Sequence, residues 1–164
     1  MKLSTKLEKL INDQTNLELT AAYIYLGMAA WFETTPYDGF SIWMRKQFNE
    51  EIGHAMRFFD FLKNRNNVIE LEALAKPTCS FASPIEVFKA SLTHEQKVTR
   101  SIQHIYKVAE EEDDFTTMEF LNWFLKEQVE EEKNVQDMLD KLLLAGENPD
   151  ALLRIDALAG KRSS

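Results

Sequence analysis

The chain has 164 residues and a mass of 19.0 kDa, the size of one domain, and its 45% hydrophobic content is sufficient for a core. Its 27 acidic residues outnumber the 19 basic ones, and the net charge of −8 argues against nucleic acid as a partner, because phosphates attract basic surfaces. The lone cysteine, Cys79, excludes an intrachain disulfide and a cysteine zinc cluster. We therefore expect a single domain over residues 1–164.

The N-terminal residues are polar, without the apolar stretch of a secretory signal. No apolar run in the chain approaches the ~20 residues that a membrane-spanning helix needs. We expect a cytoplasmic protein with no membrane association. An organellar location after removal of a transit peptide is the alternative.

Apolar residues recur at heptad-like spacing over four long segments, which predicts helices at 5–33, 40–66, 84–111 and 114–145. A short fifth helix is expected at 149–159. Ser83 and Pro84 are typical of a helix start, and Gly146 is typical of a helix end. Four adjacent helices with such stripes predict an all-α four-helix bundle.

The connection at residues 67–83 is the only long one between the predicted long helices. A helix of ~27 residues is ~40 Å long, whereas seventeen extended residues reach at most ~56–61 Å. The connection is therefore long enough to run the length of the bundle, which makes the second and third helices parallel. A bundle with one such crossover is the ferritin-like arrangement.

Polar residues interrupt or adjoin the apolar stripes close to the midpoint of each long helix, within about a turn. The interrupting residues and their close neighbours on the same faces are Glu18, Tyr25, Glu51, His54, Glu95, Gln128 and Glu131. Four helices thus send carboxylates to one level of the bundle. A buried carboxylate cluster is stable only when it is protonated or holds cations, so we expect a pair of divalent metal ions there.

The ligand types narrow the choice of metal. Carboxylates with one imidazole and no thiolate suit iron or manganese better than structural zinc. Glu51 and His54 form one Glu-x-x-His motif of the di-iron carboxylate type. The matching segment of the fourth helix runs from Gln128 to Glu131 without a histidine, which predicts an asymmetric site with one metal held more weakly.

In order and spacing, these motifs resemble those of bacterial-type non-haem ferritins. The segments that carry the resemblance are Asn16-Leu17-Glu18-Leu19 with Tyr25, Glu50-Glu51-Ile52-Gly53-His54, His94-Glu95-Gln96, Phe120-Leu121-Asn122-Trp123 and Glu127-Gln128-Val129-Glu130-Glu131-Glu132. The resemblance implies oxidation of Fe(II) by dioxygen. It also implies storage of the Fe(III) mineral in a hollow homo-oligomeric cage of twenty-four subunits, with the fifth helix lining the cage axes.

The same resemblance implies three iron positions. The first iron is bound by Glu18, Glu51 and His54. The second is bound by Glu51 as a bridge together with Glu95 and Glu131, with Gln128 nearby. The third is bound by Glu50, Glu127 and Glu130, with Glu131 shared. Tyr25 serves either in electron transfer or as a hydrogen-bonding neighbour.

Related families differ at identifiable positions. Haem-binding bacterioferritins carry a methionine where this chain has Ile52, and a second Glu-x-x-His motif that is absent here, so we expect no haem. Mini-ferritins that protect DNA place their ligands at a dimer interface and lack the in-bundle set. Two further alternatives stay open: a di-iron oxidase or electron-transfer protein that stores no iron, and a purely structural bundle.

Several residues outside the proposed site have simpler interpretations. The acidic run at 110–114 is either an exposed, helix-capping turn or an acidic mouth that admits Fe(II). His94 and His104 are expected at the surface or in packing, and Cys79 has no assignable role. The methionines expected to fill the core are Met28, Met56, Met118 and Met138.

Overall fold

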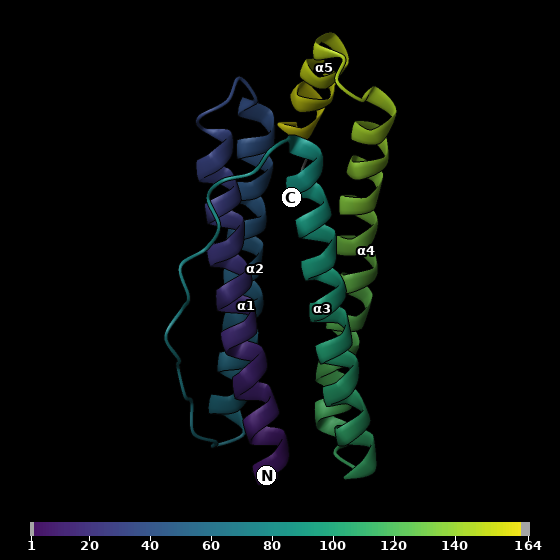
Figure 1. Ribbon diagram of the computed structural model, residues 1–164. Helices are drawn as coiled ribbons and strands as arrows, with labels where there is room; N and C mark the ends of the chain where they lie inside the picture. The colour runs from purple at the N-terminus through teal and green to yellow at the C-terminus, as the bar shows by residue number, and fades with distance from the viewer. Residues whose placement is uncertain (1, 162–164) are drawn as a thin grey trace.

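The structure is a computed structural model that describes residues 2–161, and these form five helices and no strand (Figure 1). The helices are α1 (Thr5–Phe32), α2 (Asp38–Asn64), α3 (Pro84–Glu111), α4 (Phe115–Ala145) and α5 (Pro149–Ala159). Every boundary lies within two residues of its predicted position. The all-α prediction of four long helices and a short fifth one is confirmed.

The topology follows the predicted crossover. In Figure 1, α1 and α2 are antiparallel, α3 and α4 are antiparallel, and the segment after α2 returns along the bundle, so that α2 and α3 run the same way. Asn12 of α1 bonds the backbone of Val68 and Glu70 at 2.9 and 2.8 Å. Asn16, one turn further, bonds the backbone of Glu70 and Glu72 at 2.8 and 2.9 Å. These two asparagines tie the crossover to α1.

Polar caps explain where most helices begin. Side-chain oxygens of Ser4, Ser83, Asp114 and Asn148 accept backbone N–H groups of the first turns of α1, α3, α4 and α5. The start of α2 has no such cap from Tyr37. Instead, the backbone N–H of Phe40 donates to Asp156 of α5 at 2.7 Å. The short fifth helix therefore supplies the missing cap to α2.

This contact predicts that Gly39→Ala displaces α5. A Cβ at Gly39 would lie 1.9 Å from the backbone oxygen of Asp156, which cannot move without shifting the helix. We expect a loss of about 1–3 kcal/mol in unfolding free energy and faster amide hydrogen exchange across 149–160. The matched control is Gly53→Ala on the same helix, where no atom lies within 4 Å. That control should be neutral or stabilising, and equal hydrogen exchange in the two variants would refute the contact.

The apolar core is divided by a polar layer. One cluster, at the α5 end of the bundle, includes Phe40, Phe88 and Leu142. The other includes Leu7, Phe58 and Ile102, and the two groups contain no residue in common. The buried polar residues of the next subsection lie between them along each helix.

Two sequence predictions about the core need correction. The heptad spacing on α1 puts Leu17 and Ile24 on its apolar stripe, which predicts that both are buried. Both are only half-buried, whereas Glu18 and Tyr25 are fully buried, so the inward face is rotated by one residue. Met56 was expected in the core, yet its side chain is 45% exposed. The structure confirms Met28 and Met138 as buried and leaves Met118 half-buried.

Candidate metal centre

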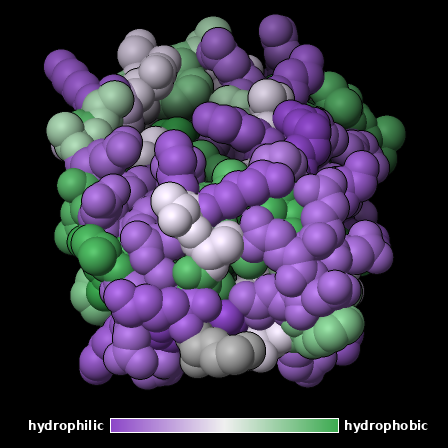
Figure 2. All heavy atoms as spheres, turned by 90° about the horizontal axis from the view of Figure 1, so that it is seen from below, coloured by the Kyte–Doolittle hydropathy of each residue, from purple (hydrophilic) through white to green (hydrophobic). Residues whose placement is uncertain are grey.

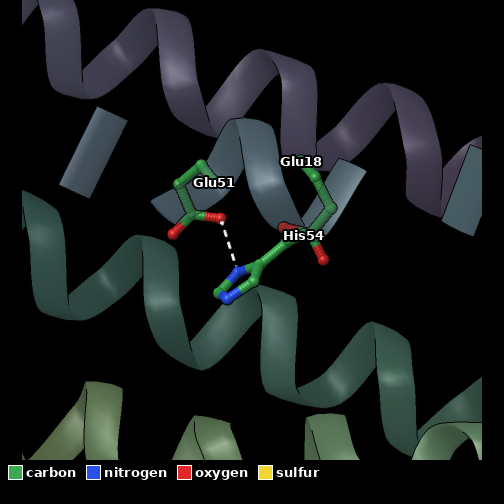
Figure 3. A group of neighbouring side chains, drawn as sticks. All are labelled: Glu18, Glu51 and His54. Atoms are coloured by element: carbon green, nitrogen blue, oxygen red, sulfur yellow. Dashed lines mark hydrogen bonds and ion pairs between the residues drawn. The ribbon is translucent and has the colours of Figure 1, made fainter. Parts of the chain in front are cut away.

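Glu18, Glu51 and His54 form a compact, buried cluster between α1 and α2 (Figure 3). Each offers a ligand atom, and these atoms all lie within 4.8 Å of one another. Glu51 and His54 are three residues apart on α2, so both point to the same side of the helix. The Nδ1 atom of His54 is 3.3 Å from Oε2 of Glu51. The structure therefore brings together the first predicted ligand set.

Glu95 of α3 and Glu131 of α4 face this cluster from the other half of the bundle. Both are buried, with 0% and 3% exposure, as is Gln128 of α4. Gln128 donates its amide N–H to Oε2 of Glu95 at 3.2 Å. Burial, and after it the charges of Glu95 and Glu131, raise the pKa of the Glu51 carboxyl. All four long helices thus contribute to one polar layer, which we call the carboxylate site.

Two glutamines that sequence reasoning missed orient this site. Gln14, one turn before Glu18 on α1, donates to Glu18 Oε1 at 2.7 Å. Gln47, one turn before Glu51 on α2, donates across the bundle to Oε2 of Glu131 at 2.9 Å. Both glutamines are completely buried. The signal in the sequence is a polar side chain four residues before a buried carboxylate, on the same helix face.

Tyr25 is part of the same hydrogen-bond network. Its hydroxyl donates to Oε1 of Glu95, and its ring is fully buried. Burial, followed by the charge of Glu95, raises the pKa of Tyr25 well above 10.0. The phenol therefore stays protonated over the physiological pH range and holds Glu95 in place.

Electrostatics show that the carboxylate site is costly without a cation. Burial is the largest cause that raises the pKa values of Glu18, Glu51 and Glu95, and neighbouring carboxylates raise them further. Hydrogen bonds from Tyr25 and Gln128 partly offset this for Glu95. One oxygen of Glu18, Oε2, is buried without a hydrogen-bond partner. Oxygen donors, one imidazole and an unsatisfied buried oxygen fit a hard divalent metal ion.

A cavity of about 590 Å³ adjoins the carboxylate site, and we call it the acidic pocket. Its walls include Glu50 of α2 and Glu127, Glu130 and Glu131 of α4, the full set implied for a third iron. Glu131 belongs to both the pocket and the carboxylate site. The pocket is open to the surface of the chain, since Glu130 is exposed and Glu50 and Glu127 are half-buried.

The acidic turn between α3 and α4 lies at the opposite end of the bundle from α5. Figure 2 views this end and shows mostly hydrophilic side chains. Asp114 caps α4 and pairs with Arg65 at 2.6 Å, so its carboxylate already has partners. The rest of the run, residues 110–113, is exposed. A structural role is thus shown for Asp114, and an acidic mouth would depend on the other four carboxylates.

A four-helix bundle with one crossover and a mid-height carboxylate–histidine centre defines the ferritin-like class of proteins. The ferritin-like domain family matches residues 8–145, and the chain belongs to the ferritin family. It is 36% identical over 161 residues to a bacterial non-heme ferritin of Staphylococcus aureus, covering 98% of this chain and 97% of that protein. A bacterial non-heme ferritin of Staphylococcus haemolyticus is 35% identical over the same shares of both chains.

Solved ferritin structures share the whole fold. An open pore ferritin from the hyperthermophilic archaeon Archaeoglobus fulgidus superposes with a TM-score of 0.97 at 40% identity, covering 99% of this chain and 100% of that one. A closed form of the same ferritin, engineered by site-directed mutagenesis, has a TM-score of 0.96 at 40% identity. It covers 99% of each chain. None of the described helices combines the length and hydropathy needed to cross a membrane.

Proposed function

We propose that this chain stores iron by oxidising Fe(II) with dioxygen at the carboxylate site and depositing Fe(III) mineral inside an oligomeric cage. The observation that supports this most directly is the buried cluster of Glu18, Glu51 and His54, whose ligand atoms lie within 4.8 Å of one another. In a purely structural bundle such a cluster would be a disadvantage, because buried carboxylates destabilise the fold unless they are protonated or bind a cation. The similarity to ferritins supports the same interpretation.

In the proposed reaction, iron is the substrate. Glu18, Glu51 and His54 would hold one Fe(II), and Glu51 would also contact a second Fe(II) held by Glu95 and Glu131. Gln128 would sit beside the second iron and keep Glu95 oriented. Two Fe(II) ions become Fe(III) and supply two electrons to one dioxygen molecule, which takes up two protons and leaves as hydrogen peroxide. Hard oxygen ligands suit Fe(III) as well as Fe(II), so the same residues can pass the oxidised ion onward.

We assign the acidic pocket as a third iron position, reached through Glu131. Glu50, Glu127 and Glu130 are solvent-accessible, so an ion there would exchange more readily than one in the buried carboxylate site. A position of this kind receives Fe(III) from the centre or supplies it with Fe(II). Its carboxylates therefore affect later iron handling more than the first turnover.

This assignment predicts the behaviour of Glu130→Ala. We expect the first rapid oxidation of Fe(II) to keep its wild-type rate within about twofold, because the buried ligands are unchanged. The ratio of iron oxidised to dioxygen consumed, or the rate after the first turnover, should change. Stopped-flow absorbance combined with an oxygen electrode measures both. Glu119→Ala, an exposed carboxylate elsewhere on α4, is the control, and progress curves identical to wild type would reject the third position.

Several wider features belong to the same proposal. The assembly is a homo-oligomer, a cage of twenty-four subunits, and the protein works in the cytoplasm with Fe(II) and dioxygen as its partners. The centre needs no haem. The ferritin structures that resemble the chain over nearly its full length support a cage.

Anaerobic titration of the metal-free protein with Fe(II), followed by a pulse of dioxygen, tests the chemistry. We expect binding that saturates at two to three Fe(II) per chain, followed by rapid oxidation of the bound ions. A protein that binds no Fe(II), or that binds it without faster oxidation than buffer, would contradict it.

A further inference from the structure

A second cavity lies between α1, α3 and the crossover, apart from the acidic pocket. Its volume is about 360 Å³, and we call it the His94 pocket. Ile24, Met28, Phe81 and Ala90 give it apolar walls from all three segments. Neither the proposed iron chemistry nor the bundle core requires this space, so it calls for a separate explanation.

The pocket changes character along α3. Ala90, His94, Lys97 and Arg100 follow one another on its wall, over ~15 Å at 1.5 Å per residue. At the Ala90 end the neighbours are apolar, and Met28 is fixed at this level by a 3.3 Å contact with the hydroxyl of Ser91. At the other end, Lys97 and Arg100 are both exposed. The cavity therefore has one apolar end and one cationic end.

His94 lies between these two ends, and one nitrogen of its imidazole ring lacks a hydrogen bond. The side chain of His94 is only 9% exposed, and its Nε2 atom has no hydrogen-bond partner. A buried nitrogen left without a hydrogen-bond partner is energetically unfavourable, so a ligand that supplies a partner would be favoured. The ring of His94 stands edge-on to that of Tyr25, with centroids 6.4 Å apart.

The charge of the pocket selects the sign of the ligand. Among the described residues that line it are two cations and no carboxylate, although the chain as a whole carries a net charge of −8. Such a local reversal of sign attracts an anion. The apolar end suits a ring or hydrocarbon body, as in other small-molecule sites with a few polar groups on apolar walls.

We propose that the His94 pocket binds a small organic anion with an apolar body, such as an aromatic carboxylate or sulfonate. The apolar body packs against Met28, Phe81 and Ala90. The acid group lies between Lys97 and Arg100, and His94 makes a hydrogen bond to a polar atom in between. This binding is independent of the iron chemistry proposed above, so either proposal can fail without the other.

Two fluorescent probes of the same shape test the charge preference on the assembled, iron-free protein. Anilinonaphthalene sulfonate has the required anionic group, and phenylnaphthylamine has the same rings without it. We expect saturable binding of the sulfonate at about one per chain. The variant Lys97→Gln/Arg100→Gln should weaken the sulfonate by roughly tenfold while changing the neutral probe less than about twofold.

Filling the pocket tests its location. Ala90→Trp should abolish binding of both probes, and Thr93→Trp, at an exposed lining position, provides a second filler should the first disturb assembly. Lys89→Gln/Lys107→Gln, two exposed lysines of α3 outside the pocket lining, is the matched control and should change neither probe. Absent or unsaturable sulfonate binding would overturn the proposal. Sulfonate affinity that is unchanged in Lys97→Gln/Arg100→Gln would also overturn it. The same holds if a Trp variant that assembles normally on gel filtration binds the probes with unchanged affinity.

Discussion

His54→Ala is expected to slow the rapid phase of Fe(II) oxidation by roughly 100-fold or more. Losing even a residue that supports a metal ligand commonly costs 10–100-fold, and His54 is the one nitrogen ligand in the proposed first iron position. Stopped-flow absorbance after mixing with dioxygen measures the rate. Glu18→Ala removes another ligand of the same iron and should have a similar effect.

The His54→Ala variant must also be shown to fold and assemble normally. His54 is 5% exposed and packs edge-on against Trp123 and Phe124, at 5.5 and 5.9 Å between ring centroids. Its removal leaves a small cavity, which should cost about 1–3 kcal/mol without unfolding the bundle. Gel filtration should show an unchanged assembly. His104→Ala, an exposed histidine on α3, should keep the wild-type rate, and a wild-type rate in His54→Ala would refute the assigned site.

Glu18→Gln is expected to abolish rapid oxidation and yet stabilise the iron-free protein. The carboxyl of Glu18 is completely buried, one of its oxygens lacks a partner, and Glu51 lies beside it. The amide keeps an oxygen to accept the 2.7 Å bond from Gln14 and adds an N–H that can donate to Glu51. We expect a gain of about 1–3 kcal/mol at neutral pH. At about 2–4 °C per kcal/mol, calorimetry of the iron-free protein resolves it.

The stability gained by Glu18→Gln should depend on pH. Burial and the charge of Glu51 raise the folded-state pKa of Glu18 well above 4.5. Between the unfolded and folded pKa values, the folded state binds more protons, so wild-type stability falls as pH rises through that window. The advantage of Glu18→Gln should therefore be small near pH 4.5 and grow toward neutral pH. Glu110→Gln, an exposed carboxylate of α3, should show no such growth, and an advantage independent of pH would contradict the argument.

These two predictions describe one trade-off. The carboxylates that suit the site to two cations also repel one another and lose hydration when the cations are absent. Buried groups of this kind are found where function requires them, at a cost in stability. The iron-free protein should accordingly gain stability when Fe(II) is added without oxygen, because the assembled site exists only in the folded state and binds the ion more tightly than the unfolded chain does.

Much of the fold could be predicted because its signals are local. Ser83 with Pro84 and Asp114 are capping residues at the starts of α3 and α4, and both helices begin within one residue of the predicted place. The stripes on α2 and α4 are equally local, since Glu51 interrupts the first and the pair of Gln128 and Glu131 interrupts the second at helical spacing. Such residues can be identified from the sequence alone.

Features that depend on packing between helices were not predictable in the same way. On α1, two neighbouring rows of side chains could face the core, one at residues 17 and 24 and one at 18 and 25. Hydropathy favours the first row, but the structure buries the second. Gln47 reaches Glu131 across 84 positions of sequence, a contact set by the arrangement of α2 and α4. The hydrogen bond from Asn12 to the crossover and the cap that Asp156 provides to α2 also depend on how the segments pack together. Only the assembled bundle shows these partners.

Iron storage requires both the oxidation of Fe(II) and a cage that retains the mineral. The most direct test measures particle mass and bound iron together, after loading the metal-free protein with Fe(II) in air. We expect a particle of about twenty-four chains that retains iron well in excess of the three positions proposed per chain. A monomer or dimer that holds no more than its two site irons would contradict storage and indicate a di-iron oxidase or electron-transfer protein instead.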